Sequence, residues 1–66
     1  MTRSVNEKIR FIRKELNLNQ SVIAETLSIT VQSYSMKERG QRPITTAELE
    51  VIAKQFKVPV AIFFEG

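Results

Sequence analysis

The stretch from Ser28 to Ile44, SITVQSYSMKERGQRPI, carries many uncharged hydrogen-bonding side chains on what reads as a helix. Ser and Thr are mediocre helix formers, because their side chains compete for backbone hydrogen bonds. The same side chains can reach nucleic-acid bases or phosphates, while Gln can bond the edge of adenine and an apolar group can touch the thymine methyl. The stretch is therefore a candidate surface for reading DNA.

A helix over about 31–38 would place several of these side chains on its outward side, with Tyr34 as the inward anchor. Lys37, Arg39 and Arg42 follow closely and supply positive charge beside the polar run. A helix that is merely solvated would be equally polar, so the place of the run in the fold has to decide between the two interpretations. The side chains expected to face outward are Val31, Gln32, Ser35 and Met36.

The 66-residue chain contains neither cysteine nor histidine. It therefore lacks disulfides and thiolate ligands, and it also lacks the commonest general base and the usual zinc ligand. No paired carboxylates or glycine-rich phosphate loop replace them, and the only glycines are Gly40 and Gly66. We expect no catalytic residues, no metal and no cofactor. We also expect one small domain over residues 1–66, with a core just large enough to be stable.

The charge balance permits a polyanionic partner without requiring one. Ten Lys and Arg residues against seven acidic residues give a formal net charge of +3, and many small domains of this charge bind no nucleic acid. No apolar run approaches the roughly 20 residues that span a bilayer. The first ten residues, MTRSVNEKIR, lack the apolar core of a signal peptide. The expected location is the cytoplasm, with no membrane contact.

Apolar spacing and capping signals divide the chain into short helices and predict no strand. The first helix begins with a capping box formed by Ser4 and Glu7, and it ends at Asn17, which tolerates the left-handed conformation. The predicted ranges are about 5–16, 20–27, 31–38, 46–56 and 59–64. The buried stripes are Val5, Ile9, Ile12 and Leu16, then Ile23, Ala24 and Leu27, and finally Leu49, Ile52, Ala53 and Phe56.

The second and third predicted helices are separated by a very tight turn. Thr30 is the expected N-cap of the third helix, and Thr45 with Glu48 forms a capping box for the fourth. Two short helices joined in this way form a helix-turn-helix, over about 20–38, whose second helix can enter the major groove of DNA. This position favours a reading surface over a merely solvated helix.

The sequence also resembles a known family over about 6–64. The segment LNQSVIAETLSITVQSYSMKERGQRP, followed by ELEVIAKQFKVPVAIFF, is similar to the Cro/C1-type (XRE-like) helix-turn-helix family, which includes phage repressors. The matching pieces are Arg13, NQ at 19–20, IA at 23–24, ERG at 38–40 and LEVIAKQFKV in the fourth helix, in this order and spacing. The resemblance implies an all-α, compact five-helix, lambda-repressor-like DNA-binding domain of a transcriptional regulator, usually a dimer.

The resemblance also implies roles for individual residues. By position, Gln32 and Met36 face base edges with Val31 beside them, and Arg13 with Glu38 matches a buried ion pair that ties the first helix to the third. The matching phosphate contacts are Asn19, Gln20, Thr30, Ser33 and Arg42. Ser35 and Lys37, which also lie on the third helix, are further predicted phosphate contacts. The alternative for Ser33 and Ser35 is a role as spacers, and the alternative for Lys37 and Arg42 is simple solvation.

Two positions depart from the family pattern. Ser28 occupies a turn position that is often glycine, which predicts a less comfortable turn. Lys37 stands where the family is usually apolar, just before Glu38. Its aliphatic stem can pack while its ammonium reaches solvent or DNA. The alternative is a rotated third helix that turns Met36 inward and removes it from the reading surface.

The apolar residues that remain after the core stripes are filled are Phe11, Val51, Val60, Ile62, Phe63 and Phe64. Some must close the core over the last helix, and the rest can form an exposed patch of the kind that marks an interface. The resemblance places the dimer contact near the last predicted helix. We therefore expect a homodimer through residues 58–64, with Val58, Val60, Ile62, Phe63 and Phe64 at the interface.

The expected function is sequence-specific binding of double-stranded DNA by a transcriptional regulator, with repression by a dimer on an inverted-repeat operator. The alternative is an antitoxin-like or adaptor module on the same scaffold, which would bind a protein partner through its C-terminal apolar face. RNA binding is disfavoured, because single-strand recognition uses exposed aromatic rings. The aromatic residue of the third helix, Tyr34, is expected to be buried.

Overall fold

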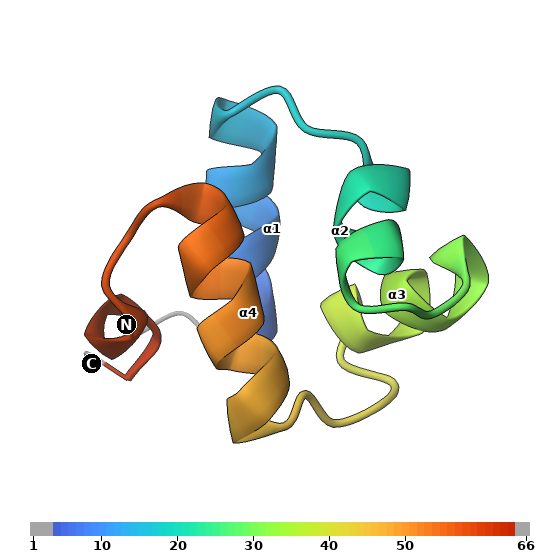
Figure 1. Ribbon diagram of the computed structural model, residues 1–66. Helices are drawn as coiled ribbons and strands as arrows, with labels where there is room; N and C mark the ends of the chain where they lie inside the picture. The colour runs from blue at the N-terminus through green and yellow to red at the C-terminus, as the bar shows by residue number, and fades with distance from the viewer. Residues whose placement is uncertain (1–3, 65–66) are drawn as a thin grey trace.

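The structure is a computed structural model that describes residues 4–64, and its secondary structure is helical (Figure 1). This confirms the predicted all-α class, and no strand occurs within the described residues. The fifth helix is a tighter 3-10 turn that Pro59 precedes as its N-cap. The elements are α1 (Val5–Glu15), α2 (Gln20–Thr26), α3 (Val31–Glu38), α4 (Thr46–Phe56) and the 3-10 helix η1 (Val60–Phe63).

Side-chain caps set the starts of α3 and α4, as the sequence predicts. The Thr30 hydroxyl accepts a hydrogen bond from the Ser33 N–H at 3.1 Å. At the start of α4, the Thr45 hydroxyl accepts from the Glu48 N–H at 3.1 Å while the Glu48 carboxylate accepts from the Thr45 N–H at 2.9 Å. These bonds satisfy amide groups that the helix itself leaves without partners. Both helices therefore occupy the predicted ranges of 31–38 and 46–56.

Left-handed residues end three of the helical segments. Asn17 has a φ of 57° after α1, Ser28 has 58° after α2, and Lys57 has 59° after α4. Asn tolerates this conformation better than other residues with a side chain. The sequence therefore anticipates the turn at Asn17, and it also identifies Ser28 as a position where glycine would fit better.

The turn between α2 and α3 is strained by its serine, so Ser28→Gly is expected to stabilise the fold. The left-handed conformation costs a residue with a side chain about 1–2 kcal/mol. Part of the gain is lost because glycine loses more entropy on folding, which leaves roughly 0.5–1 kcal/mol. Chemical denaturation measures this difference. The matched control is Ser21→Gly, because Ser21 is exposed within α2 and glycine destabilises a helix interior. If both variants are destabilised alike, the turn holds no such strain.

The core lies where all five helical elements meet. The stripe of α4 is fully buried, as predicted, and Ile9 is the buried centre of the α1 stripe. Leu16, at the C-cap of α1, is an exception because its side chain is 45% exposed. The buried apolar residues are Ile9, Ile23, Ala24, Tyr34, Leu49, Ile52, Ala53, Phe56 and Phe63.

The helix-turn-helix forms one side of the molecule. Helices α2 and α3 pack against each other and lie on the right in Figure 1, whereas η1 lies beyond α4 on the left. The loop that follows α3 passes below the core to the start of α4 (Figure 1). Among residues 4–64 there is no helix with the length and apolar character needed to cross a membrane. The arrangement leaves one surface of α3 open to a partner.

Candidate nucleic-acid interface

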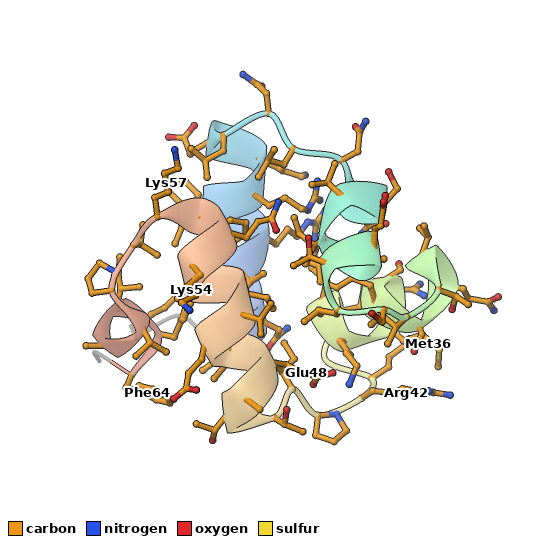
Figure 2. The ribbon with its side chains drawn as sticks, in the orientation of Figure 1. Met36, Arg42, Glu48, Lys54, Lys57 and Phe64 are labelled. Atoms are coloured by element: carbon orange, nitrogen blue, oxygen red, sulfur yellow. The ribbon has the colours of Figure 1, made fainter. Side chains whose placement is uncertain are left out.

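The outward surface of α3 carries the three side chains predicted to contact bases. Val31 and Gln32 are exposed, and Met36 is half-buried. Met36 belongs neither to the core nor to the partly buried apolar residues packed against it, so the alternative with Met36 turned inward does not describe the structure. In Figure 2, Met36 and Arg42 lie on the α3 side of the molecule, far from Phe64 beside η1.

Tyr34 and Glu38 lie on the opposite side of α3 and fasten it to the fold. Both are buried, and the Tyr34 ring is fully enclosed as the sequence predicts. The Tyr34 hydroxyl has no hydrogen-bond partner within residues 4–64. Burial, together with the nearby Glu38 carboxylate, raises the pKa of Tyr34 far above its usual value. The phenol therefore stays neutral, and the inner side of α3 is a rigid support for the exposed one.

A buried ion pair joins α1 to α3. Arg13 Nε donates to Glu38 Oε2 at 2.8 Å, and Arg13 Nη2 donates to Glu38 Oε1 at 2.9 Å. A third guanidinium hydrogen bond reaches the Leu18 carbonyl at 2.7 Å. The side chains of Arg13 and Glu38 are 11% and 2% exposed. This two-pronged geometry is the strong form of an Arg–carboxylate contact, and it orients α3 relative to α1.

Acid is expected to weaken this arrangement. Burial alone would raise the pKa of Glu38, but hydrogen bonding by Arg13 and its neighbours outweighs burial and holds the pKa below the usual 4.5. A carboxyl group with a lowered pKa in the folded state stabilises the fold above its ordinary pKa, and this contribution is lost as the pH falls. The free energy of unfolding should therefore decrease from pH 5 toward pH 3.

Urea unfolding at several pH values measures this decrease. The Glu48 pKa is lowered as well, where the hydrogen bonds from Thr45 and Lys37 outweigh burial, so both carboxylates contribute with the same sign. General charge repulsion also grows in acid, and a second series at high salt controls for it because salt screens exposed charges far more than buried pairs. A stability that is constant or rising from pH 5 to pH 3 at high salt contradicts the assignment.

The predicted phosphate contacts surround the exposed surface of α3, but their side chains differ in availability. Asn19 is exposed at the N-cap of α2, and Arg42 is exposed in the loop after α3. The Gln20 amide turns inward and donates to Glu38 Oε1 at 3.2 Å, so its predicted role depends on its backbone at the start of α2. Thr30 caps α3, while Ser33 and Ser35 are half-buried along it.

The structure pairs the Lys37 ammonium with groups of the protein itself. It donates to the Pro43 carbonyl at 3.0 Å and to Glu48 Oε1 at 3.1 Å. The stem packs as the sequence predicts, but the ammonium is already paired. The prediction that Lys37 contacts a phosphate is therefore not supported by its conformation. Sequence reasoning missed Glu48 as its partner, since the capping box with Thr45 fully accounts for a glutamate at that position.

The predicted dimer residues do not form one exposed patch. Phe64 is 60% exposed, and Val58, Val60 and Ile62 are half-buried. Phe63 is only 2% exposed because its ring fills the core, so its assignment to the interface was wrong. A shallow surface groove beside η1 also includes α4 residues outside the predicted interface range of 58–64. Its lining is Ala47, Glu50, Val51, Ala53, Lys54, Val58 and Val60.

An α3 with one buried side, one exposed polar side and a short partner helix defines a helix-turn-helix domain. A sequence model described as helix-turn-helix matches residues 9–63, which is most of the chain. The protein therefore belongs to the Cro/C1-type helix-turn-helix family, whose members are DNA-binding transcriptional regulators.

Two curated relatives agree with this membership. The chain is 31% identical over 61 residues to an uncharacterized HTH-type transcriptional regulator of Sinorhizobium fredii, covering 92% of this chain and 43% of the relative. It is 33% identical over 60 residues to an uncharacterized transcriptional regulator in the ATPase CF(0) region of Rhodospirillum rubrum, covering 91% and 56%. The chain thus spans about half the length of these relatives. No solved structure matches it significantly.

Proposed function

We propose that the protein binds double-stranded DNA sequence-specifically by placing α3 in the major groove. The observation that carries this proposal is the contrast between the two sides of α3. Gln32 is exposed on one side, while Tyr34 and Glu38 are buried on the other. In a helix-turn-helix the residues near the start of the second helix contact base edges. Gln32 can form two hydrogen bonds with adenine, and Val31 or Met36 can touch a thymine methyl.

Phosphate contacts on both flanks of α3 would set its register in the groove. Asn19 and the backbone of Gln20 lie at the start of α2, and helix starts attract phosphates through their free amides and dipole. Arg42 lies on the other flank, where its Nη1 is 3.5 Å from Ser33 Oγ. Such contacts position a protein on DNA without reading sequence. The net charge of +3 agrees with a polyanionic partner.

We propose further that two copies act together as a repressor on an inverted repeat. The half-buried Val58, Val60 and Ile62 and the exposed Phe64 lie around η1, and Figure 2 places Phe64 on the side opposite Met36 and Arg42. A contact there would leave both copies of α3 free to reach successive major grooves, about 34 Å apart. Occupying a promoter in this way blocks polymerase access.

A selection from a random duplex pool at physiological salt tests the proposal. We expect enrichment of an inverted repeat whose half-sites are about 10 base pairs apart centre to centre. Sedimentation without DNA at tens of micromolar should give a dimer. If the pool is not enriched and binding is weak and steeply salt-dependent, the charge supports only non-specific contact.

A second candidate function is supported by the apolar groove beside η1. Val51 is exposed there and lies beside the half-buried Val58 and Val60, as expected for an antitoxin-like or adaptor protein that binds a protein partner. The double variant Gln32→Ala with Arg42→Ala separates the two candidates. This variant should abolish the protein's function if that function is to read DNA. It should leave the function largely intact if the protein acts by binding a protein partner through the groove.

A further inference from the structure

The Lys37 ammonium joins α3 to the loop that follows it and to the first turn of α4. Its two acceptors, the Pro43 carbonyl and Glu48 Oε1, lie six and eleven residues away along the chain. The ion pair is sheltered, with side chains that are 14% and 21% exposed for Lys37 and Glu48. A lysine whose ammonium already donates hydrogen bonds to two groups of the protein is poorly placed to neutralise a phosphate.

The Glu48 carboxylate joins this contact to the N-terminus of α4. The same Oε1 atom that accepts from Lys37 also accepts from the Thr45 N–H, and the Thr45 hydroxyl accepts from the Glu48 N–H in return. One oxygen atom therefore caps α4 and binds α3. We refer to Lys37, Pro43 and Glu48 as the loop clamp.

The loop clamp encloses the segment that carries Arg42. The backbone of this segment is also held at its beginning, where the Gln41 N–H donates to the Met36 carbonyl at 2.8 Å and the Gly40 N–H to the Lys37 carbonyl at 3.1 Å. Arg42 is thus flanked by Gln41, bound to α3, and by Pro43, bound to Lys37. Figure 2 shows Arg42 projecting from the loop on the α3 side, and its guanidinium reaches Ser33 on the first turn of α3.

We propose that Lys37 is a positioning residue for DNA binding: through the loop clamp it holds Arg42 and the start of α4 at a fixed place beside α3. Phosphate contact by Arg42 and base contact by α3 then come from one pre-organised surface, which lowers the entropy lost on binding. This inference rests on the proposed DNA-binding function. It replaces a direct phosphate contact by Lys37 with an indirect role.

Charge variants at the two ends of the loop clamp distinguish a positioning role of Lys37 from a direct phosphate contact. Lys37→Met removes a positive charge and keeps the stem, whereas Glu48→Gln removes a negative charge and keeps an oxygen for the Thr45 N–H. If Lys37 positions the loop, both variants should weaken binding to the selected duplex by roughly two- to fivefold, the effect of losing one such pair. The double variant should bind no worse than Lys37→Met alone, because the charge attraction that Glu48→Gln removes is already absent without the ammonium.

The matched control is Glu15→Gln, which makes the same charge change on an exposed glutamate of α1. Removing this negative charge should leave duplex affinity unchanged or slightly higher. The direct-contact role predicts the same for Glu48→Gln, because DNA repels carboxylates and the released ammonium could reach a phosphate. If Glu48→Gln binds as tightly as the parent while Lys37→Met lowers the salt slope by about one, the positioning role is overturned.

Amide hydrogen exchange on the DNA-free protein tests the loop clamp independently of the proposed function. Faster exchange at the amides of residues 41, 42, 44 and 45 in both Lys37→Met and Glu48→Gln, but not in Glu15→Gln, supports the clamp. Unchanged exchange in that segment overturns it. If the parent protein binds no duplex at all, the proposed function fails while the exchange measurement still decides whether Lys37 holds the loop.

Discussion

Arg13→Ala is expected to lower the free energy of unfolding by about 3–5 kcal/mol, because it strands the buried Glu38 carboxylate without its partner. Three guanidinium hydrogen bonds are lost together, two to Glu38 and one to the Leu18 carbonyl. A domain of this size has a total stability of only about 3–10 kcal/mol. Urea denaturation should therefore find a midpoint far below that of the parent, because the loss is about a third or more of the total stability.

The matched control is Arg10→Ala, on the same helix but with an exposed side chain, which should stay within about 0.5 kcal/mol of the parent. A double variant, Arg13→Met with Glu38→Met, should recover much of the loss, because apolar residues of similar volume can replace a buried pair. If Arg13→Ala melts at the same midpoint as the parent, the ion pair does not support the fold.

Gln32→Ala is expected to weaken binding to the selected operator by about 1–3 kcal/mol, or roughly 5- to 150-fold. The loss should be confined to specific binding, because Gln32 is exposed on the α3 surface and contributes little to the fold. Discrimination at one base pair of each half-site should relax. Titration of labelled duplexes that differ only at that base pair measures both effects.

Gln55→Ala is a suitable control, since Gln55 lies on α4 and its side chain accepts a hydrogen bond from Thr26 on α2 at 2.6 Å. Its operator affinity should match that of the parent. A Gln32→Ala variant that keeps its affinity and its preference among the altered duplexes would show that another side chain reads the base.

Local signals made much of the fold predictable from the sequence. The threonine caps Thr30 and Thr45 set the starts of α3 and α4, and apolar spacing identified the buried stripe of α4. Asn17 and Ser28 adopt the left-handed conformation at the expected turns. These features depend on residues a few positions apart, so they can be predicted from the sequence alone. Even the Arg13–Glu38 ion pair was expected, because the family resemblance supplied the long-range pairing.

Contacts between distant segments explain what the sequence reading missed. Lys37 is paired because the loop after α3 returns Pro43 and Glu48 to it. Phe63 is buried because η1 packs its ring into the core, and the interface assigned to it assumed an exposed side chain. Leu16, at the C-cap of α1, is exposed because the elements packed against α1 leave its side chain largely uncovered. None of these outcomes follows from periodicity, since each depends on the tertiary packing.

An NMR titration with the selected duplex identifies the surface that binds DNA. We expect the largest amide shift changes at residues 19–20, at 30–36 and around Arg42, with η1 and the exposed surface of α1 little affected. Spectra of the Gln32→Ala variant should lose the changes within α3 first. Changes that cluster at η1 and α4, with α3 unperturbed, would contradict DNA binding by α3 and identify the apolar groove as the binding surface.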